Sequence, residues 1–219
     1  MTSTSERRTV FLDAAVLAAP TTRSLILFGQ LHQDARFTSR WSRKAEQEAD
    51  SALERRADRR GERLGRTVPP VLVSMLRAAA DWGTDVIAPE APDVEAALED
   101  TDDGDRHILA SAAAAGSYLV VTANVADFGR ADLGRLGISA VNPDLFLARV
   151  FTPAMYRFAL ESMARRRTLA PDTPEAIQAS LTRAHPRLVE AMRQAYPDVV
   201  PALVGHHPPG ARFSEGVAA

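Results

Sequence analysis

Short apolar runs alternate with helical patterns along most of the 219-residue chain. Five of these runs are β-branched or apolar and typical of buried strands, namely 9–12 (TVFL), 37–39, 85–88 (DVIA), 118–122 (YLVVT) and 138–141. Helical spacing or helix-start signals follow them at 17–31, 43–60, 71–82, 106–115 and 144–151. This alternation predicts an α/β domain with a central, mainly parallel sheet over residues 9–150.

After Pro153 the pattern changes to helices only. We expect these helices over 154–167, 174–184 and 186–195, each near a proline that can begin or break a helix. We therefore divide the chain into a flexible N-terminus (1–8), an α/β domain (9–150), a helical C-terminal extension (151–203) and a loose tail (204–219).

Composition narrows the class of protein. Hydrophobic residues make up 46% and charged residues 25%, which excludes wholesale disorder. The formal net charge of -2 excludes a uniformly cationic nucleic-acid coat, although it permits a local basic patch. The chain has no cysteine, which excludes a disulfide framework, a thiol nucleophile and a thiolate zinc site.

The N-terminal segment resembles a signal peptide only faintly. Arg7 and Arg8 precede the apolar run 10–19, but Asp13 interrupts that run. No stretch reaches the roughly 18 uninterrupted apolar residues that a membrane span needs. We therefore expect a soluble, cytoplasmic protein with no membrane partner.

Acidic and amide side chains cluster where the expected strands end. Asp13 follows the first strand, Asp105 begins the helix before the strongest strand, and Asn124 and Asp127 follow that strand. Functional residues of a parallel sheet gather at the carboxyl ends of its strands. Converging carboxylates repel one another unless a cation lies between them. Hard oxygen ligands without cysteine favour Mg²⁺ or Mn²⁺.

Each of these residues also has a purely structural interpretation. Asp13 could cap the next helix, and Asp127 could belong to a turn. Asp102 and Asp103 could form a turn or an N-cap run. The acidic residues of 46–50 lie on a strongly charged helix, where a solvated face is the default. It is the ordered set, rather than any one residue, that indicates a site.

That ordered set resembles the PIN domain, the fold of Mg²⁺-dependent ribonucleases that includes VapC-type toxins of bacterial toxin–antitoxin pairs. Four segments carry the resemblance: 10–17 with Asp13, 40–48 with Trp41-Ser42 and Glu48, 103–110 with Asp105, and 122–128 with Asn124 and Asp127. The Trp-Ser pair is typical of one PIN subgroup. Asn124 stands where many PIN enzymes carry Asp, so the resemblance implies a metal shell that relies more on Asp127 or Asp103.

The resemblance implies a three-layer α/β/α fold and hydrolysis of RNA phosphodiester bonds with Mg²⁺ or Mn²⁺ as cofactor. By resemblance the catalytic residues are Asp13, Glu48, Asp105, Asn124 and Asp127, and the metal ligands are Asp13, Asp105 and Asp103. The implied partners are an RNA substrate (tRNA or rRNA), a cognate antitoxin protein and a second copy of the chain in a homodimer.

A basic stretch could meet the RNA backbone. Basic residues outnumber acidic ones between 40 and 66, and Arg55, Arg59 and Arg63 recur at a spacing that places them on one side of a helix. Phosphate binding by these arginines would make affinity strongly salt-dependent. The alternative is a solvated helix face on which the arginines pair with neighbouring acidic residues.

Two other functions compete with the ribonuclease. A haloacid-dehalogenase-like phosphatase also begins with Asp after a strand, but its motif requires a second Asp where this chain has Ala15. A catalytically degenerate PIN module would bind RNA or protein without cleavage. For His107 we expect a packed or helix-surface position rather than a role at the rim of the site.

Overall fold

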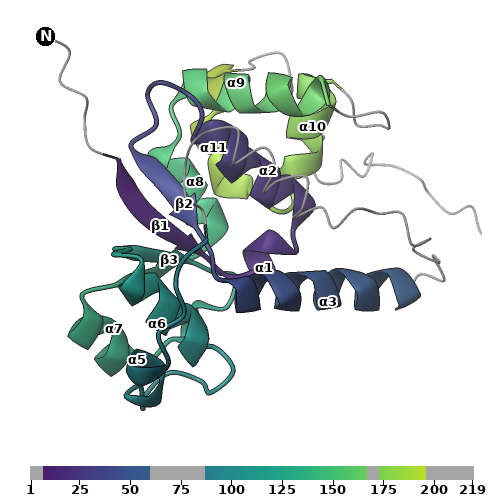
Figure 1. Cartoon of the computed structure of the whole chain (residues 1–219). Coiled ribbons are helices and arrows are strands. Elements are labelled where there is room, and N and C mark those ends of the chain that lie inside the picture. The colour runs from purple at the N-terminus through teal and green to yellow at the C-terminus, as the bar shows by residue number, and fades with distance from the viewer. Residues whose placement is uncertain (1–6, 60–86, 167–172, 196–219) are drawn as a thin grey trace, which may run out of the picture.

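The structure is a computed structural model that describes residues 7–59, 87–166 and 173–195, and Figure 1 shows its elements. Within this part of the chain, β1 (Arg8–Leu12), β2 (Phe37–Arg40), β3 (Leu119–Val121) and β4 (Ser139–Val141) form one sheet. All pairs are parallel and the strand order is β2-β1-β3-β4. The predicted α/β class with a parallel sheet is confirmed.

Helices connect and follow the strands. The connections contain α1 (Ala14–Leu17), α2 (Pro20–Gly29), α3 (Arg43–Arg59), α5 (Pro92–Ala96), α6 (Arg106–Ala114), the 3-10 helix η1 (Val125–Asp127) and α7 (Arg130–Leu136). After β4 come α8 (Pro143–Val150), α9 (Pro153–Ala164), α10 (Pro174–Leu181), α11 (Pro186–Ala191) and the 3-10 helix η2 (Arg193–Ala195). In Figure 1, α2 and α9–α11 gather above the strands and α5–α7 below them.

Most expected elements are present, with instructive differences. Within the range 17–31 where a helix was expected, α2 begins at Pro20, because proline suits the first turn of a helix. The short helices α5 and α7 were not predicted. The expected helix 71–82 lies outside the described residues. The expected strand 85–88 begins outside them, and its described part contributes one parallel bridge from Ile87 to Trp41.

The apolar run of β1 forms the centre of the sheet. Val10, Phe11 and Leu12 are fully buried, and β1 pairs with β2 on one side and β3 on the other. A strand covered on both faces needs such a continuous apolar run. Leu12 lies opposite Val121, so β1 and β3 end side by side.

The C-terminal helices share the hydrophobic core of the sheet domain. α9 packs on α2, and α11 packs on α8. Among the described residues, one contiguous buried cluster contains both Phe11 of β1 and Leu188 of α11. A Cβ atom on Gly29 would lie 2.2 Å from the ring of Phe151, so this ring packs directly on the glycine of α2 and would have to move to admit a larger residue.

No helix in the described residues combines the length and the apolarity needed to cross a membrane.

Candidate active site

The carboxyl ends of β1 and β3 meet at the point where the order of the sheet reverses. From β1 the chain goes to β2 on one side and later enters β3 on the other. Ligands of open α/β sheets bind outside the carboxyl ends of strands at such a switch point. The backbone N–H of Asp13 donates a 3.1 Å hydrogen bond to the carbonyl of Val121, which holds Asp13 beside the end of β3.

Asp13 is buried and held by a threonine. Its side chain is 5% exposed, and its Oδ2 accepts a 2.7 Å hydrogen bond from Oγ1 of Thr122. Although Asp13 occupies the N-cap position of α1, its carboxylate makes no capping hydrogen bond. Burial raises the pKa of Asp13 and the charge of Asp127 adds to this, while Thr122 and the amides of Ala15 and Ala14 lower it only in part.

Asp105 faces the same group of charges. It lies at the N-cap of α6 without a side-chain capping bond and is half-buried. Burial raises its pKa to about 6, and the charges of Asp13, Asp127 and Asp102 contribute in that order. The carboxylates of Asp13 and Asp127 therefore lie close enough to Asp105 to oppose its ionisation, although the three residues come from separate segments.

Glu48 joins this group from α3. Burial raises the pKa of Glu48, as do the charges of Asp13 and Asp105, whereas Lys44 lowers it. Its Oε1 lies 2.9 Å from Nε2 of His107. We call Asp13, Glu48, Asp105 and Asp127 the acidic group.

His107 lies in the protein interior and contacts one member of the acidic group. Its side chain is 3% exposed, and its Nε2 is at ion-pair distance from Glu48, while the backbone of Gly104 is a hydrogen-bond partner that favours protonation of the ring. Burial, and next the charge of Lys44, lower the pKa of His107 to about 4. The imidazole is therefore neutral near pH 7.

The other candidate residues lie outside the acidic group. Asn124 is exposed, and its backbone N–H donates to Thr122 Oγ1 at 3.0 Å. Asp103 is exposed and pairs with Arg106 at 2.8 Å, and it is not among the charges that act on Asp13 or Asp105. Arg55 and Arg59 are exposed on α3. Arg63 lies outside the described residues.

Thr122 and the contact of His107 with Glu48 are parts of the site that sequence reasoning missed. Thr122 is fully buried, and its hydroxyl both donates to Asp13 and accepts from the backbone of Asn124. A hydroxyl residue directly after the apolar run of β3 was a readable signal for a polar contact at the strand end. Nothing local in the sequence signals the contact of His107, since its partner lies on a different helix.

The donor set suits a hard divalent cation. In the part of the chain that the structure describes, no three Asp, Glu, His or Cys side chains are arranged as a ready-made metal site. The acidic group nevertheless offers carboxylate oxygens whose mutual repulsion a cation would relieve. Mg²⁺ usually keeps several water molecules and needs only one or two protein carboxylates, so Asp13 and Asp105 are the residues that could hold such an ion.

No protein-family model, no curated protein and no solved structure matches this chain. Its function is therefore inferred from the geometry and chemistry of the acidic group.

Proposed function

We propose that the chain is a Mg²⁺-dependent endoribonuclease with a PIN-like α/β/α domain. The observation that carries the proposal is the position of Asp13, which is buried at the end of β1 and hydrogen-bonded to Val121 and Thr122 at the end of β3, at the switch point of the sheet. Burial, and next the charges of Asp13 and Asp127, raise the pKa of Asp105 to about 6, which supports the proposal. Like charges gathered from three segments at a switch point are unfavourable unless a cation joins them. Perturbed carboxylates of this kind are typical of functional sites.

Each residue has a definable task in this reaction. Asp13 and Asp105 would hold the cation, which when bound supplies stabilisation of phosphoryl charge and a more acidic water. Glu48 would accept a hydrogen bond from a water molecule and orient it, and Asp127 would complete the set of oxygen donors. Thr122 keeps the carboxylate of Asp13 in one orientation through its 2.7 Å hydrogen bond.

The arginines of α3 would guide the RNA. Arg55 and Arg59 are exposed one turn apart on the same helix that carries Glu48. Phosphates drawn to them would lie along the helix that leads into the acidic group. Binding would then weaken steeply with salt, since it releases counterions from the RNA.

The partners belong to the same proposal. As the toxin of a toxin–antitoxin pair, the protein would cleave tRNA or rRNA in the cytoplasm and form a homodimer. A cognate antitoxin would place an arginine against the acidic group, because a cationic side chain there would relieve the repulsion between the carboxylates. Failure of the neighbouring open reading frame to relieve growth arrest on co-expression would count against this pairing.

Cleavage of total bacterial RNA tests the enzyme directly. Wild type, Asp13→Asn and Asp34→Asn are compared with Mg²⁺, with Mn²⁺ and with EDTA. Asp34 is an exposed acid that precedes β2, at the amino-terminal end of a strand parallel to β1, whereas Asp13 follows the carboxyl end of β1, so Asp34 controls for loss of one charge. We expect discrete fragments that need metal, disappear in Asp13→Asn and persist in Asp34→Asn.

Two results would contradict the proposal. One is cleavage that survives Asp13→Asn, which would indicate a contaminating nuclease. The other is no cleavage with either ion by folded protein free of any co-purified inhibitor. That second result, together with retained RNA or protein affinity, would identify the degenerate binding module instead.

A further inference from the structure

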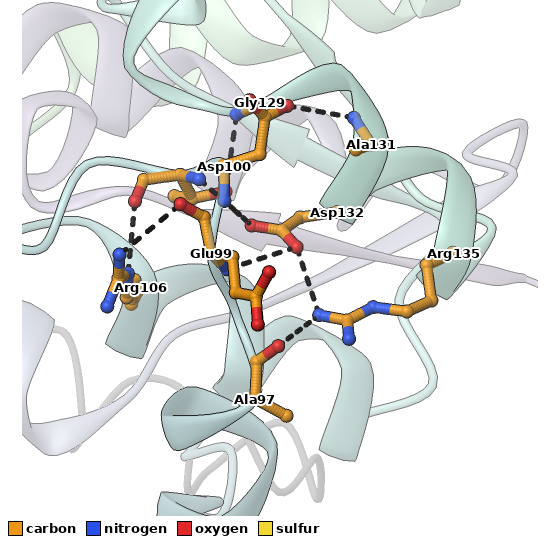
Figure 2. Close-up of polar contacts among 9 residues, drawn as sticks. Ala97, Glu99, Asp100, Arg106, Gly129, Ala131, Asp132 and Arg135 are labelled. Atoms are coloured by element: carbon orange, nitrogen blue, oxygen red, sulfur yellow. Dashed lines mark hydrogen bonds and ion pairs between the residues drawn. The ribbon is translucent and has the colours of Figure 1, made fainter.

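Backbone amides of the loop that leads to Asp105 donate hydrogen bonds to a buried carboxylate. Asp132 of α7 is 3% exposed, and its Oδ2 accepts hydrogen bonds from the N–H groups of Asp100 and Thr101, each at 2.9 Å. The N–H of Glu99 approaches Oδ1 at 3.4 Å. Figure 2 shows Asp132 pointing from its helix into this loop.

Further hydrogen bonds join the same two segments in both directions. The N–H of Asp102 donates to the carbonyl of Asp127 at 2.9 Å. The N–H of Gly129 donates to Thr101 Oγ1 at 3.2 Å, and the N–H of Ala131 donates to Asp100 Oδ2 at 2.9 Å. Several hydrogen bonds thus hold segment 99–102 against segment 127–132. We call this set of hydrogen bonds the loop clamp.

Two arginines add hydrogen bonds to Asp132 and to backbone carbonyls around it. Nε of Arg106 donates to the carbonyl of Thr101 at 3.1 Å, on the far side of the loop from the amides. Arg135 donates to Asp132 Oδ1 at 2.9 Å and to the carbonyl of Ala97 at 2.6 Å. Figure 2 shows both arginines at the edges of the clamp.

The clamp holds Asp132 in its ionised form. Burial opposes ionisation, but hydrogen bonds from the backbone of Thr101 and Asp100 outweigh it and leave the pKa of Asp132 below its usual value. Hydrogen bonds to a charged acceptor are stronger than those between neutral groups. The loop is therefore fixed to α7 by its strongest type of contact.

One clamped segment contains a member of the acidic group, and the other leads directly to a second member. Asp127 begins one segment, and Asp105 follows the other, with its N–H bonded to the carbonyl of Asp102 at 2.8 Å. We propose that Asp132 is a positioning residue, which holds these two segments together so that Asp105 and Asp127 face Asp13. This inference rests on the proposed function, in which those carboxylates hold the metal.

Asp144 provides a matched control. It too is buried, and its carboxylate accepts hydrogen bonds from the backbone N–H groups of another segment, Arg187 at 3.1 Å and Leu188 at 2.9 Å. That segment is α11, which carries none of the acidic group. Asp132→Asn and Asp144→Asn therefore remove the same kind of contact, one beside the site and one away from it.

The rate of RNA cleavage is measured against Mg²⁺ concentration for both variants, with thermal unfolding as the measure of stability. Both should lower the melting temperature. Only Asp132→Asn should raise the Mg²⁺ concentration for half-maximal cleavage, by about tenfold or more, as loss of a residue supporting metal ligands does. Excess Mg²⁺ should restore part of its rate. Unchanged metal dependence in folded Asp132→Asn, or an equal shift in Asp144→Asn, would overturn the positioning role.

A second measurement separates this inference from the enzyme proposal. If the wild type shows no metal-dependent cleavage, the proposed function fails, and amide hydrogen exchange with Mn²⁺ binding then decides the inference. The positioning role of Asp132 is supported if Asp132→Asn, unlike Asp144→Asn, speeds amide exchange in 99–106 and 127–131 and weakens Mn²⁺ binding. It is overturned if either quantity stays at its wild-type value.

Discussion

The hydroxyl of Thr122 donates a 2.7 Å hydrogen bond to the buried carboxylate of Asp13. This bond joins the ends of two neighbouring strands, because Thr122 follows β3 and Asp13 follows β1. It also favours the ionised form of Asp13, in opposition to burial, which raises the pKa of that carboxyl. Removing the hydroxyl should therefore affect both stability and protonation.

Thr122→Val removes this hydroxyl and keeps the shape of the side chain. The variant should lose about 1–3 kcal/mol of unfolding free energy near pH 7, because a buried acceptor loses its donor. The difference from wild type should shrink as pH falls through the pKa of Asp13, since the bond favours the charged form. Thr122→Ser should retain most of the stability. Denaturant unfolding at several pH values measures the stability difference and its pH dependence. Equal stability of the wild type and Thr122→Val near pH 7 would contradict a stabilising hydrogen bond from Thr122 to Asp13.

The raised pKa of Asp105 predicts how the metal-free protein responds to pH. In the folded state this pKa is about 6, against a usual 3.8, so the folded protein binds this proton more tightly than the unfolded chain. Stability should therefore fall as pH rises from about 4 to above 6. Asp105→Asn should raise the melting temperature near pH 7 while abolishing cleavage. Asp58 is an exposed acid on α3, and Asp58→Asn should leave the melting temperature and the cleavage rate unchanged.

Divalent cations should reverse this pH effect. Added Mg²⁺ should raise the melting temperature of the wild type in EDTA-treated samples, because a ligand that binds only the folded state stabilises it. The increase should be larger above the pKa of Asp105, about 6, than below it, where protons compete for the carboxylates. An increase of the same size in Asp13→Asn would show that the ion binds elsewhere.

His107 should act through contact with Glu48 and without a change of charge. Its pKa is lowered to about 4 by burial and by Lys44, so it stays neutral where the enzyme would work. His107→Phe keeps a buried ring but removes the nitrogen that lies 2.9 Å from Glu48. We expect a fall in cleavage rate of about tenfold at saturating Mg²⁺. His107→Gln should recover part of the rate, and a Phe variant with full activity would exclude this role.

Two glycines of the loop clamp region form a matched pair. A Cβ on Gly129 would lie 2.3 Å from the backbone carbonyl of Asp100, so Gly129→Ala must push segments 99–102 and 127–132 apart. A Cβ on Gly134, within α7, would meet nothing within 4 Å. Gly134→Ala should be neutral or stabilising by about 0.5–1 kcal/mol. Gly129→Ala should destabilise and raise the Mg²⁺ requirement, and equal behaviour of the two variants would contradict the clamp.

The strands and long helices were readable because each carries its own signal. β1 is a continuous apolar run, and α3 has small residues at helical spacing. α5 and α7 were missed because they are short. α5 lies in an acidic stretch that also suits a turn, while the end of α7 depends on Gly137, whose φ is 66°.

Within the site, local patterns found the acidic positions but not their orientation. Asp103 and Asp105 stand in the same acidic run, yet Asp103 turns toward Arg106 and only Asp105 joins the acidic group. The contacts of Asp132 link residues 31 to 33 positions apart in sequence. Pairings of that range follow from tertiary packing, which no short motif encodes.

Lys44 is the only lysine in the sequence, and it lies one helical turn before Glu48. Its side chain is 46% exposed, with Nζ 3.7 Å from a carboxylate oxygen of Glu95. Amine-directed dyes therefore have a single side-chain target in this chain, at the border of the acidic group. Because the chain has no cysteine, a second dye can be attached to any introduced thiol. The native sequence thus offers an optical reporter beside the acidic group, able to register in real time the arrival of any ligand that binds there.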